Sequence, residues 1–139
     1  MSLGGTRTSN LEEMHRVALQ DERRIVLVAE VQGEVVAMAH IAPSGADNAP
    51  HRAVVQRVAV AETARGGGVG RSLMAAVEAT AVERGLTLLW LTTHDETDAC
   101  SFYEAVGYAK LGVMPAYSQR PDGTLAPGAF YYKVLRGSS

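Results

Sequence analysis

Two arginines and four glycines share a seven-residue stretch, Arg65-Gly66-Gly67-Gly68-Val69-Gly70-Arg71, whose composition is that of an anion-binding turn. It follows a valine-rich segment, 52–60, that we predict to be a strand, and it opens a predicted amphipathic helix over residues 72–84. Glycines let backbone N–H groups crowd around an anion, and the start of a helix adds partial positive charge. Each arginine can add a full charge. The stretch therefore predicts a phosphate-binding site.

The glycine spacing narrows the kind of phosphate ligand. Read from Gly66, the dinucleotide pattern G-x-G-x-x-G places its last position on Arg71 and fails. The chain contains no Gly-Lys pair, which excludes a P-loop. The remaining pattern, R-x-x-G-x-G at Arg65, Gly68 and Gly70, resembles the pyrophosphate signature of the GNAT (GCN-five-related) N-acetyltransferases. A turn without a ligand is the alternative, although three consecutive glycines cost ordering entropy that a plain turn would not need.

The resemblance to this family covers about residues 51–135. The run 99–108 matches the family's A-x-x-x-(F/L)-Y-x-x-x-G-(F/Y) helix, and the segments 115–117, 121–123 and 130–135 resemble a narrower branch. That branch contains the tabtoxin-resistance acetyltransferases and related enzymes that modify small amines or antibiotics. The resemblance implies an α/β (α+β) fold, with a GNAT-type mixed β-sheet flanked by helices, and acetyl-CoA (coenzyme A) as the cofactor.

The resemblance also implies which residues hold the cofactor. Backbone groups near Val58 and Val60 would bind the amides of the pantetheine arm, and a backbone N–H there would stabilise the oxyanion on the thioester carbonyl. No metal site is expected. The residues implied to bind the cofactor are Val58, Ala59, Val60, Arg65, Gly66, Gly67, Gly68, Val69, Gly70, Arg71 and Ser101.

The implied reaction is direct attack of an amine on the thioester in a ternary complex. Tyr103 matches the family's tyrosine and is our candidate general acid for the departing thiolate. The base is less evident, because relatives in the narrower branch carry acidic residues where this chain has Val54 and Thr92. His94 has a suitable intrinsic pKa for a base, and an exposed loop histidine is the alternative.

Two further residues are candidates for contact with the acceptor. Gln56 lies on the same face of its predicted strand as Val58 and could orient an acceptor or water, or be an ordinary buried glutamine. Tyr117 belongs to a segment, 115–127, that could form a wall over the acceptor or a simple hairpin connection.

Composition limits the class of protein. The 139 residues suggest one domain, which we place at residues 9–136 behind a flexible tail, 1–8. A net charge of −2 gives no support for nucleic acid or an anionic membrane as a bulk partner. The chain lacks a long apolar run, so no membrane span is expected. Cys100 is the single cysteine, so no internal disulfide can form, which fits a cytoplasmic location.

The hydrophobic pattern predicts helices at 9–21, 72–84 and 98–106. It predicts strands at 25–31, 34–41, 52–60, 86–93, 108–114 and 129–135. GNAT folds usually have a further strand and helix before this point, so we expect a fold shortened at the N-terminus. The edge left open by a missing strand would favour self-association, and a homodimer is accordingly expected as one form.

We expect an N-acetyltransferase that moves the acetyl group of acetyl-CoA to a primary amine of a small molecule. A peptide or protein α-amine is the rival acceptor. A non-catalytic acyl-CoA-binding domain is a second alternative, and a nucleotide-binding regulator is a third.

Overall fold

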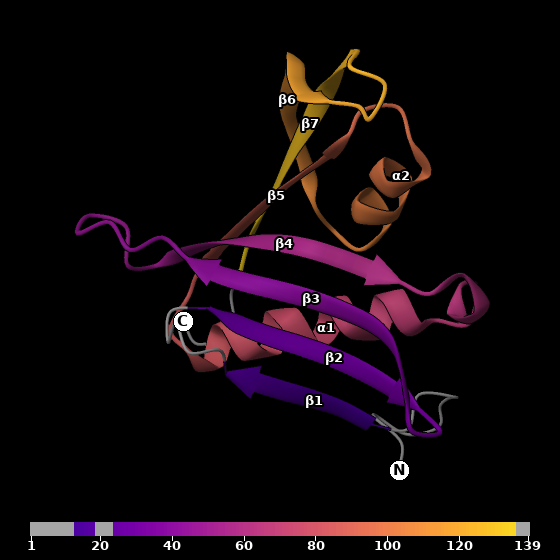
Figure 1. Cartoon of the computed structure of the whole chain (residues 1–139). Coiled ribbons are helices and arrows are strands. Elements are labelled where there is room, and N and C mark those ends of the chain that lie inside the picture. Colours follow the sequence, from indigo (N-terminus) through magenta and orange to yellow (C-terminus); the bar gives the residue numbers. More distant parts are fainter. Residues whose placement is uncertain (1–12, 19–23, 136–139) are drawn as a thin grey trace.

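The structure, a computed structural model, describes residues 13–18 and 24–135, and within them the strands form one mixed sheet of order β1-β2-β3-β4-β5-β7-β6 (Figure 1). The predicted tail, 1–8, lies outside the described residues. No helix in the described ranges is long and apolar enough to span a membrane. In chain order the elements are β1 (Glu13–Ala18), β2 (Ile25–Val31), β3 (Glu34–Pro43), β4 (Arg52–Val60), η1 (Glu62–Ala64), α1 (Val69–Glu83), β5 (Leu88–His94), α2 (Asp98–Ala105), β6 (Ala109–Gln119) and β7 (Leu125–Val134).

The first described element differs from its prediction. Residues Glu13–Ala18 form strand β1, antiparallel to β2, with Ala18 opposite Ile25. The predicted helix, 9–21, is therefore wrong for these six residues, and the rest of it lies outside the described ranges. A long-range ladder along the outer edge of β2 outweighs the weak helix preference of this short segment, and local sequence patterns do not show such pairing.

Strands β2, β3 and β4 and helix α1 build the main core. The most buried residues of β2 and β3 stand at alternate positions, and this face of each strand packs beneath α1. Helix α1 returns Leu73, Met74 and Val77 to this face, all almost fully buried. The packing fixes α1, and therefore the glycine turn at its N-terminus, against the C-terminal end of β4.

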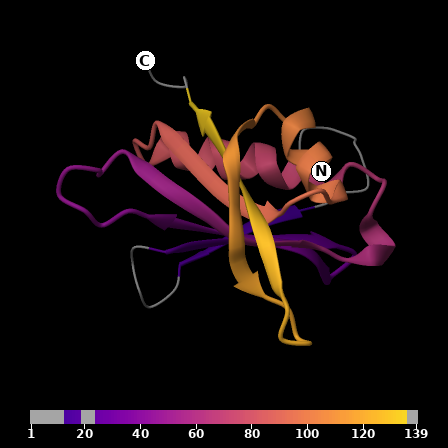
Figure 2. The ribbon, with the colours of Figure 1, turned by 90° about the horizontal axis from the view of Figure 1, so that it is seen from above.

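The sheet divides between β4 and β5. These parallel strands pair only from Arg52↔Leu88 to Val54↔Trp90, whereas β4 continues to Val60 and β5 to His94. On its other side β5 pairs with β7 along its whole length, from Leu88↔Val134 to His94↔Gly128. Figure 1 shows β5, β6 and β7 rising away from β4, and Figure 2 shows the β6–β7 hairpin crossing the β1–β4 part of the sheet. The separation opens the sheet in the middle, where the sequence predicts the site.

The hairpin of β6 and β7 is longer than predicted. Its turn includes Pro121-Asp122-Gly123, as expected, but most of the predicted connection, 115–127, belongs to the two strands. A register shift between Met114 and Ser118 takes up the irregularity around Pro115, and Ala116 there has a φ of 58°. A bulge lets a proline and a left-handed residue remain within a strand ladder. The sequence of this segment, with its prolines, was predicted as a connection because such a bulge cannot be recognised from the sequence.

Candidate functional site

The first part of the candidate site is a cavity of about 600 Å³ between the end of β4 and the facing ends of the two helices. Arg65 and Arg71 flank it and are both exposed, and Phe102 and Tyr103 of α2 form its opposite wall. The Nε of Arg65 donates to the carbonyl of Val60 at 3.2 Å, which anchors this cation beside the turn. A positively charged hollow of this kind at a helix N-terminus suits a phosphate group.

Two of the glycines have backbone conformations that side chains disfavour. Gly66 and Gly68 have φ of 85° and 88°, and nothing lies within 4 Å of where their Cβ atoms would be. Gly68 is the N-cap of α1, and its carbonyl accepts from the Ser72 N–H at 3.0 Å. Helix α1 therefore begins at Val69, three residues before the predicted start, because the glycine turn itself leads directly into the first helical turn.

Gly70 has a different reason to be glycine. A Cβ there would lie 3.2 Å from the ring of Phe102, so the missing side chain lets the first turn of α1 approach α2. Gly67 does not have a positive φ, and a Cβ built there would lie 3.8 Å from its nearest neighbour, the Ala64 carbonyl oxygen. In the R-x-x-G-x-G pattern, Gly68 is required for its backbone conformation and Gly70 for close packing. Gly67, the second of the three consecutive glycines, is the least constrained.

Strand β4 carries a bulge beside this cavity. Met38 pairs with Ala59 and His40 with Gln56, so β4 has one more residue than β3 between these pairs. Arg57, within the bulge, has a φ of 55°. A bulge turns backbone groups out of the ladder, and the β5 side of β4 is unpaired beyond Val54. Both features leave strand backbone available to an extended ligand, which fits the expected placement of the pantetheine arm along Val58 and Val60.

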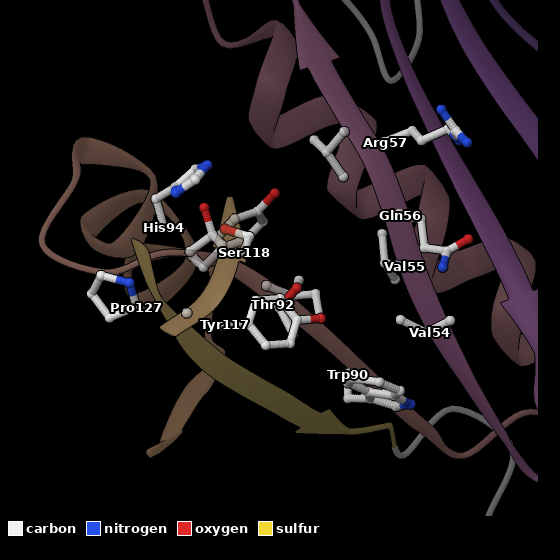
Figure 3. Close-up of a pocket in the computed structure, with 15 residues that line it drawn as sticks. Val54, Val55, Gln56, Arg57, Trp90, Thr92, His94, Tyr117, Ser118 and Pro127 are labelled. Atoms are coloured by element: carbon white, nitrogen blue, oxygen red, sulfur yellow. The ribbon is translucent and has the colours of Figure 1, made fainter. Parts of the chain in front are cut away.

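The second part of the site is a cavity of about 650 Å³ on the other side of the opening (Figure 3). Strand β4 forms one wall, and β5 together with the β6–β7 hairpin forms the other. Trp90 of β5 and Tyr117 of β6 give this second wall an aromatic surface. Both rings pack next to Phe130 of β7, at ring-centroid distances of 6.2 and 5.3 Å. A cavity of this size accommodates a small organic molecule.

Tyr103 and Val58 line both cavities. The Tyr103 ring is buried and packs against Phe102, Tyr108 and Tyr131. Burial raises the pKa of Tyr103 to about 12. This hydroxyl therefore keeps its proton across the ordinary pH range and is available to donate a hydrogen bond at the junction of the cavities.

His94 ends β5 at the rim of the larger cavity, with an exposed side chain. Its backbone is firmly held: the His94 carbonyl accepts from the Thr97 hydroxyl at 2.8 Å and from the Cys100 thiol at 3.4 Å. His94 also lies opposite Gly128 in the β5–β7 ladder. The ring is consequently placed at the cavity mouth on a fixed backbone, a position from which an imidazole can exchange protons with solvent.

The structure brings together most of the residues singled out from the sequence. Val58, Val60, Arg65, Gly66, Gly68, Gly70 and Arg71 line the smaller cavity, and Gln56, His94 and Tyr117 line the larger one. Four others do not line either: Ala59 is exposed on β4, Ser101 is exposed on α2, and Gly67 and Val69 border a separate hollow behind the turn.

Several lining residues were missed by sequence reasoning. Arg57, Trp90, Ser118 and Pro127 line the larger cavity, and Asp98 and Ala99 the smaller one. The side-chain alternation from Gln56 along β4 could have indicated part of that wall. Trp90, Ser118 and Pro127 depend on how β5, β6 and β7 pair, and no local pattern reveals that register.

The chain matches the Acetyltransferase (GNAT) family over residues 5–108. It is 42% identical over 73 residues to N-alpha-acetyltransferase 80 of Mus musculus, a match covering 52% of this chain and 22% of that protein. The chain thus spans about a fifth of the length of this curated relative.

Solved structures give the same relationship. The ribosomal-protein-alanine N-acetyltransferase of Brucella melitensis superposes with a TM-score of 0.73 and 31% identity, over 81% of this chain and 69% of that one. The fold is also that of yncA of Salmonella typhimurium, solved with its cofactor acetyl-CoA (TM-score 0.73, 20% identity, 84% and 67% covered). This chain belongs to the GNAT acetyltransferase family, whose cofactor is acetyl-CoA.

Proposed function

We propose that this protein transfers the acetyl group of acetyl-CoA to a primary amine of a small molecule by direct attack in a ternary complex. The observation that carries the proposal is the pair of cavities that meet at Val58 and Tyr103. One has the charge and backbone geometry for a diphosphate, and the other has the size of a small acceptor. A shared junction is what group transfer between two bound molecules requires.

The residues of the smaller cavity fit the cofactor. The left-handed Gly66 and Gly68 leave open space where side chains would stand, so the N–H groups at the start of α1 can approach a diphosphate. Arg65 and Arg71 add positive charge on either side. When bound, acetyl-CoA supplies the acetyl thioester. The unpaired edge and bulge of β4 would align the pantetheine arm, with a backbone N–H near Val58 donating to the thioester oxygen.

Transfer forms one C–N bond, breaks one C–S bond and removes one proton from the amine. In our proposal Tyr103 donates a hydrogen bond to the sulfur as negative charge develops there. Since its pKa is about 12, well above that of a thiol, it stabilises the thiolate more than it protonates it. His94 accepts the amine proton and releases it to solvent from the cavity mouth.

The acceptor has two candidate classes. A small amine agrees with the cavity volume and with the resemblance to the tabtoxin-resistance branch, since the hairpin that carries the segments 115–117 and 121–123 also provides Tyr117 and Ser118 to the wall. A peptide α-amine is the second candidate, because the mouse relative is named N-alpha-acetyltransferase 80 and the Brucella melitensis relative is named a ribosomal-protein-alanine N-acetyltransferase. An α-amine, with a pKa near 8, is also easier to deprotonate.

Thiol release from acetyl-CoA, measured over a panel of amines and peptides and checked by the product mass, tests the proposal. Acetylation of at least one amine with saturation kinetics supports it. Tight CoA binding without turnover of any amine would instead favour a non-catalytic acyl-CoA-binding domain. Stronger binding of ATP or NAD than of CoA in a thermal-shift assay would favour a nucleotide-binding regulator.

We also infer a cytoplasmic homodimer. Strand β1 covers the edge of β2 that was expected to be open, so this edge does not support the dimer. Strand β6 ends the other side of the sheet, and Leu111, Val113 and Met114 are 72%, 46% and 49% exposed there. An open strand edge with apolar side chains is a surface that a second copy can cover. The free, buried Cys100 accords with the reducing cytoplasm as the compartment.

A further inference from the structure

The smaller cavity is built by two helices that belong to different parts of the divided sheet. Helix α1 packs on β2 and β3, whereas α2 packs against β5 and β6 (Figure 1). Strands β4 and β5 pair only as far as Val54↔Trp90, so no strand ladder fixes one helix against the other along the cavity. Because both helices line the cavity, contacts that bridge the two parts of the sheet determine its shape.

Lys133 of β7 makes such a bridge. Its ammonium group donates to both carboxylate oxygens of Glu78 in α1, at 3.0 and 3.1 Å, and to the carbonyl of Val106, the C-cap of α2, at 3.0 Å. These three contacts match the three N–H donors of a lysine. The side chains of Lys133 and Glu78 are only 27% and 23% exposed, so salt and water screen this ion pair less than a pair on the open surface. One ammonium group therefore joins β7, α1 and the end of α2.

The backbone at the end of α2 is shaped around this ammonium group. Gly107 has a φ of 102°, and a Cβ there would lie 2.9 Å from the Nζ of Lys133. The next N–H, that of Tyr108, donates to the carbonyl of Tyr103 at 2.9 Å and closes the helix. The glycine thus provides both the turn that ends α2 and the space that the lysine occupies.

Lys133 also contacts the ring that supports Tyr103. Its Nζ lies 5.6 Å from the centroid of the Tyr108 ring, within the range of a cation–π contact. The Tyr108 ring in turn packs edge-on against Tyr103, at a centroid distance of 6.0 Å. The buried Tyr108 hydroxyl lacks a hydrogen bond of ordinary length and angle to a described residue. Burial raises the pKa of Tyr108, and the nearby carboxylate of Glu78 raises it further. Packing and the ammonium group therefore hold this ring in place.

We propose that Lys133 is a positioning residue for acetyl transfer, because it holds the end of α2 and the Tyr108 ring so that the Tyr103 hydroxyl stays at the junction of the two cavities. This inference rests on the proposed function, in which that hydroxyl donates to the sulfur. Lys133 lines neither cavity of the candidate site, so it acts through its neighbours and not on a ligand. A hydrogen bond weakens steeply as its angle departs from linearity, so a small shift of α2 is enough to lower the rate.

A purely structural role for the ion pair is the opposing interpretation. In that case, loss of Lys133 would lower the stability of the fold or the affinity for CoA. Any effect on the rate would then be the same with or without the Tyr103 hydroxyl. A positioning role lowers kcat only while that hydroxyl is present. A double-mutant cycle on kcat therefore separates the two interpretations.

The experiment compares the wild type with Lys133→Met, Tyr103→Phe and the double variant, using the amine that the wild type acetylates fastest. Methionine has nearly the length of lysine but has neither its charge nor its donors. We measure kcat, KM, the calorimetric Kd for CoA and the melting temperature of each protein. Lys110→Met is the matched control, since the Nζ of Lys110 also lies 3.0 Å from a carboxylate, that of Asp95, but stays within the β5–β6 side of the sheet. Lys133→Arg tests for rescue, because a groove of about 430 Å³ beside Lys133 has room for a guanidinium group.

We expect Lys133→Met to lower kcat by about 5- to 20-fold, since it weakens the hydrogen bond of Tyr103 without removing it. The Kd for CoA should change by less than about 3-fold, because the glycine turn is untouched. In the Tyr103→Phe background, the same substitution should lower kcat by less than about 2-fold, as expected for two residues that act as a unit. Lys133→Arg should keep at least about half of the wild-type kcat, and so should Lys110→Met.

An equal loss of kcat in both backgrounds, an unchanged kcat in folded Lys133→Met, or a loss confined to CoA affinity would overturn the inference. If Lys133→Met does not fold, the same cycle with Glu78→Gln decides by the same criterion, with a smaller expected loss of about 3-fold, because the amide oxygen still accepts from Lys133. Failure of the underlying function looks different, since the wild type would then bind acetyl-CoA and acetylate no amine or peptide. In that case the inference falls together with the proposed function.

Discussion

Substitution of Tyr103 by phenylalanine removes one hydroxyl from the junction of the two cavities and leaves the ring. The ring should stay in place because Phe102, Tyr108 and Tyr131 surround it. A hydrogen bond to a developing thiolate is worth about 1.5–3 kcal/mol. At about 1.4 kcal/mol per tenfold change, its loss lowers kcat by about 10- to 150-fold. Affinity for CoA should change less than 3-fold, because the glycine turn and the arginines are untouched.

The pH dependence provides an independent check on the same residue. With the pKa of Tyr103 raised to about 12 by burial, its acid form persists throughout the accessible range. The wild-type rate should therefore rise with pH as the amine loses its proton and then level off, without a descending limb below about pH 10. Thiol-release kinetics from pH 6 to 10, with calorimetric titration of CoA, measure both effects. A variant that keeps more than half of the wild-type kcat would refute the role given to this hydroxyl.

Three further predictions concern the cofactor turn and the sheet edge. Gly68→Ala, at a φ of 88°, should destabilise the fold by about 1 kcal/mol and weaken CoA binding, whereas Gly67→Ala should do neither; equal melting temperatures for the two variants would contradict this. Arg71→Gln should raise the Kd for CoA about 10-fold at low salt and less at 0.5 M salt, and a loss that does not depend on salt would mean that Arg71 acts through structure. The double variant Leu111→Lys/Val113→Lys should run as a 14.8 kDa monomer in light scattering where the wild type has twice that mass; a monomeric wild type would exclude the dimer proposed through β6.

Segments with continuous apolar runs were predictable from the sequence. The bounds of β2 and β4 agree with the predicted 25–31 and 52–60, and α2 ends one residue before the predicted 106. The glycine turn was also predictable, because Gly66 and Gly68 have the left-handed conformations that its composition suggests. In these places local propensity and tertiary packing favour the same structure.

The remaining features depend on contacts between distant segments. Strand β1 pairs along the edge of β2. The sheet opens because β5 separates from β4 after Trp90 while it stays paired with β7. The left-handed backbone of Arg57 has no signal in the sequence, since it belongs to a bulge defined by the register of β3 and β4. Long-range register of this kind has no local signal, and for that reason the acceptor wall had to be seen in the structure.

Calorimetric titration of acetyl-CoA into the wild type and into Gly68→Glu tests the central claim most directly. We predict micromolar binding to the wild type. We also predict at least a 100-fold loss of affinity in the variant, because a glutamate would place a strained backbone and a negative charge where we propose that the diphosphate binds. Unchanged affinity in a Gly68→Glu protein that is still folded would contradict the claim that the turn 66–70 holds the cofactor.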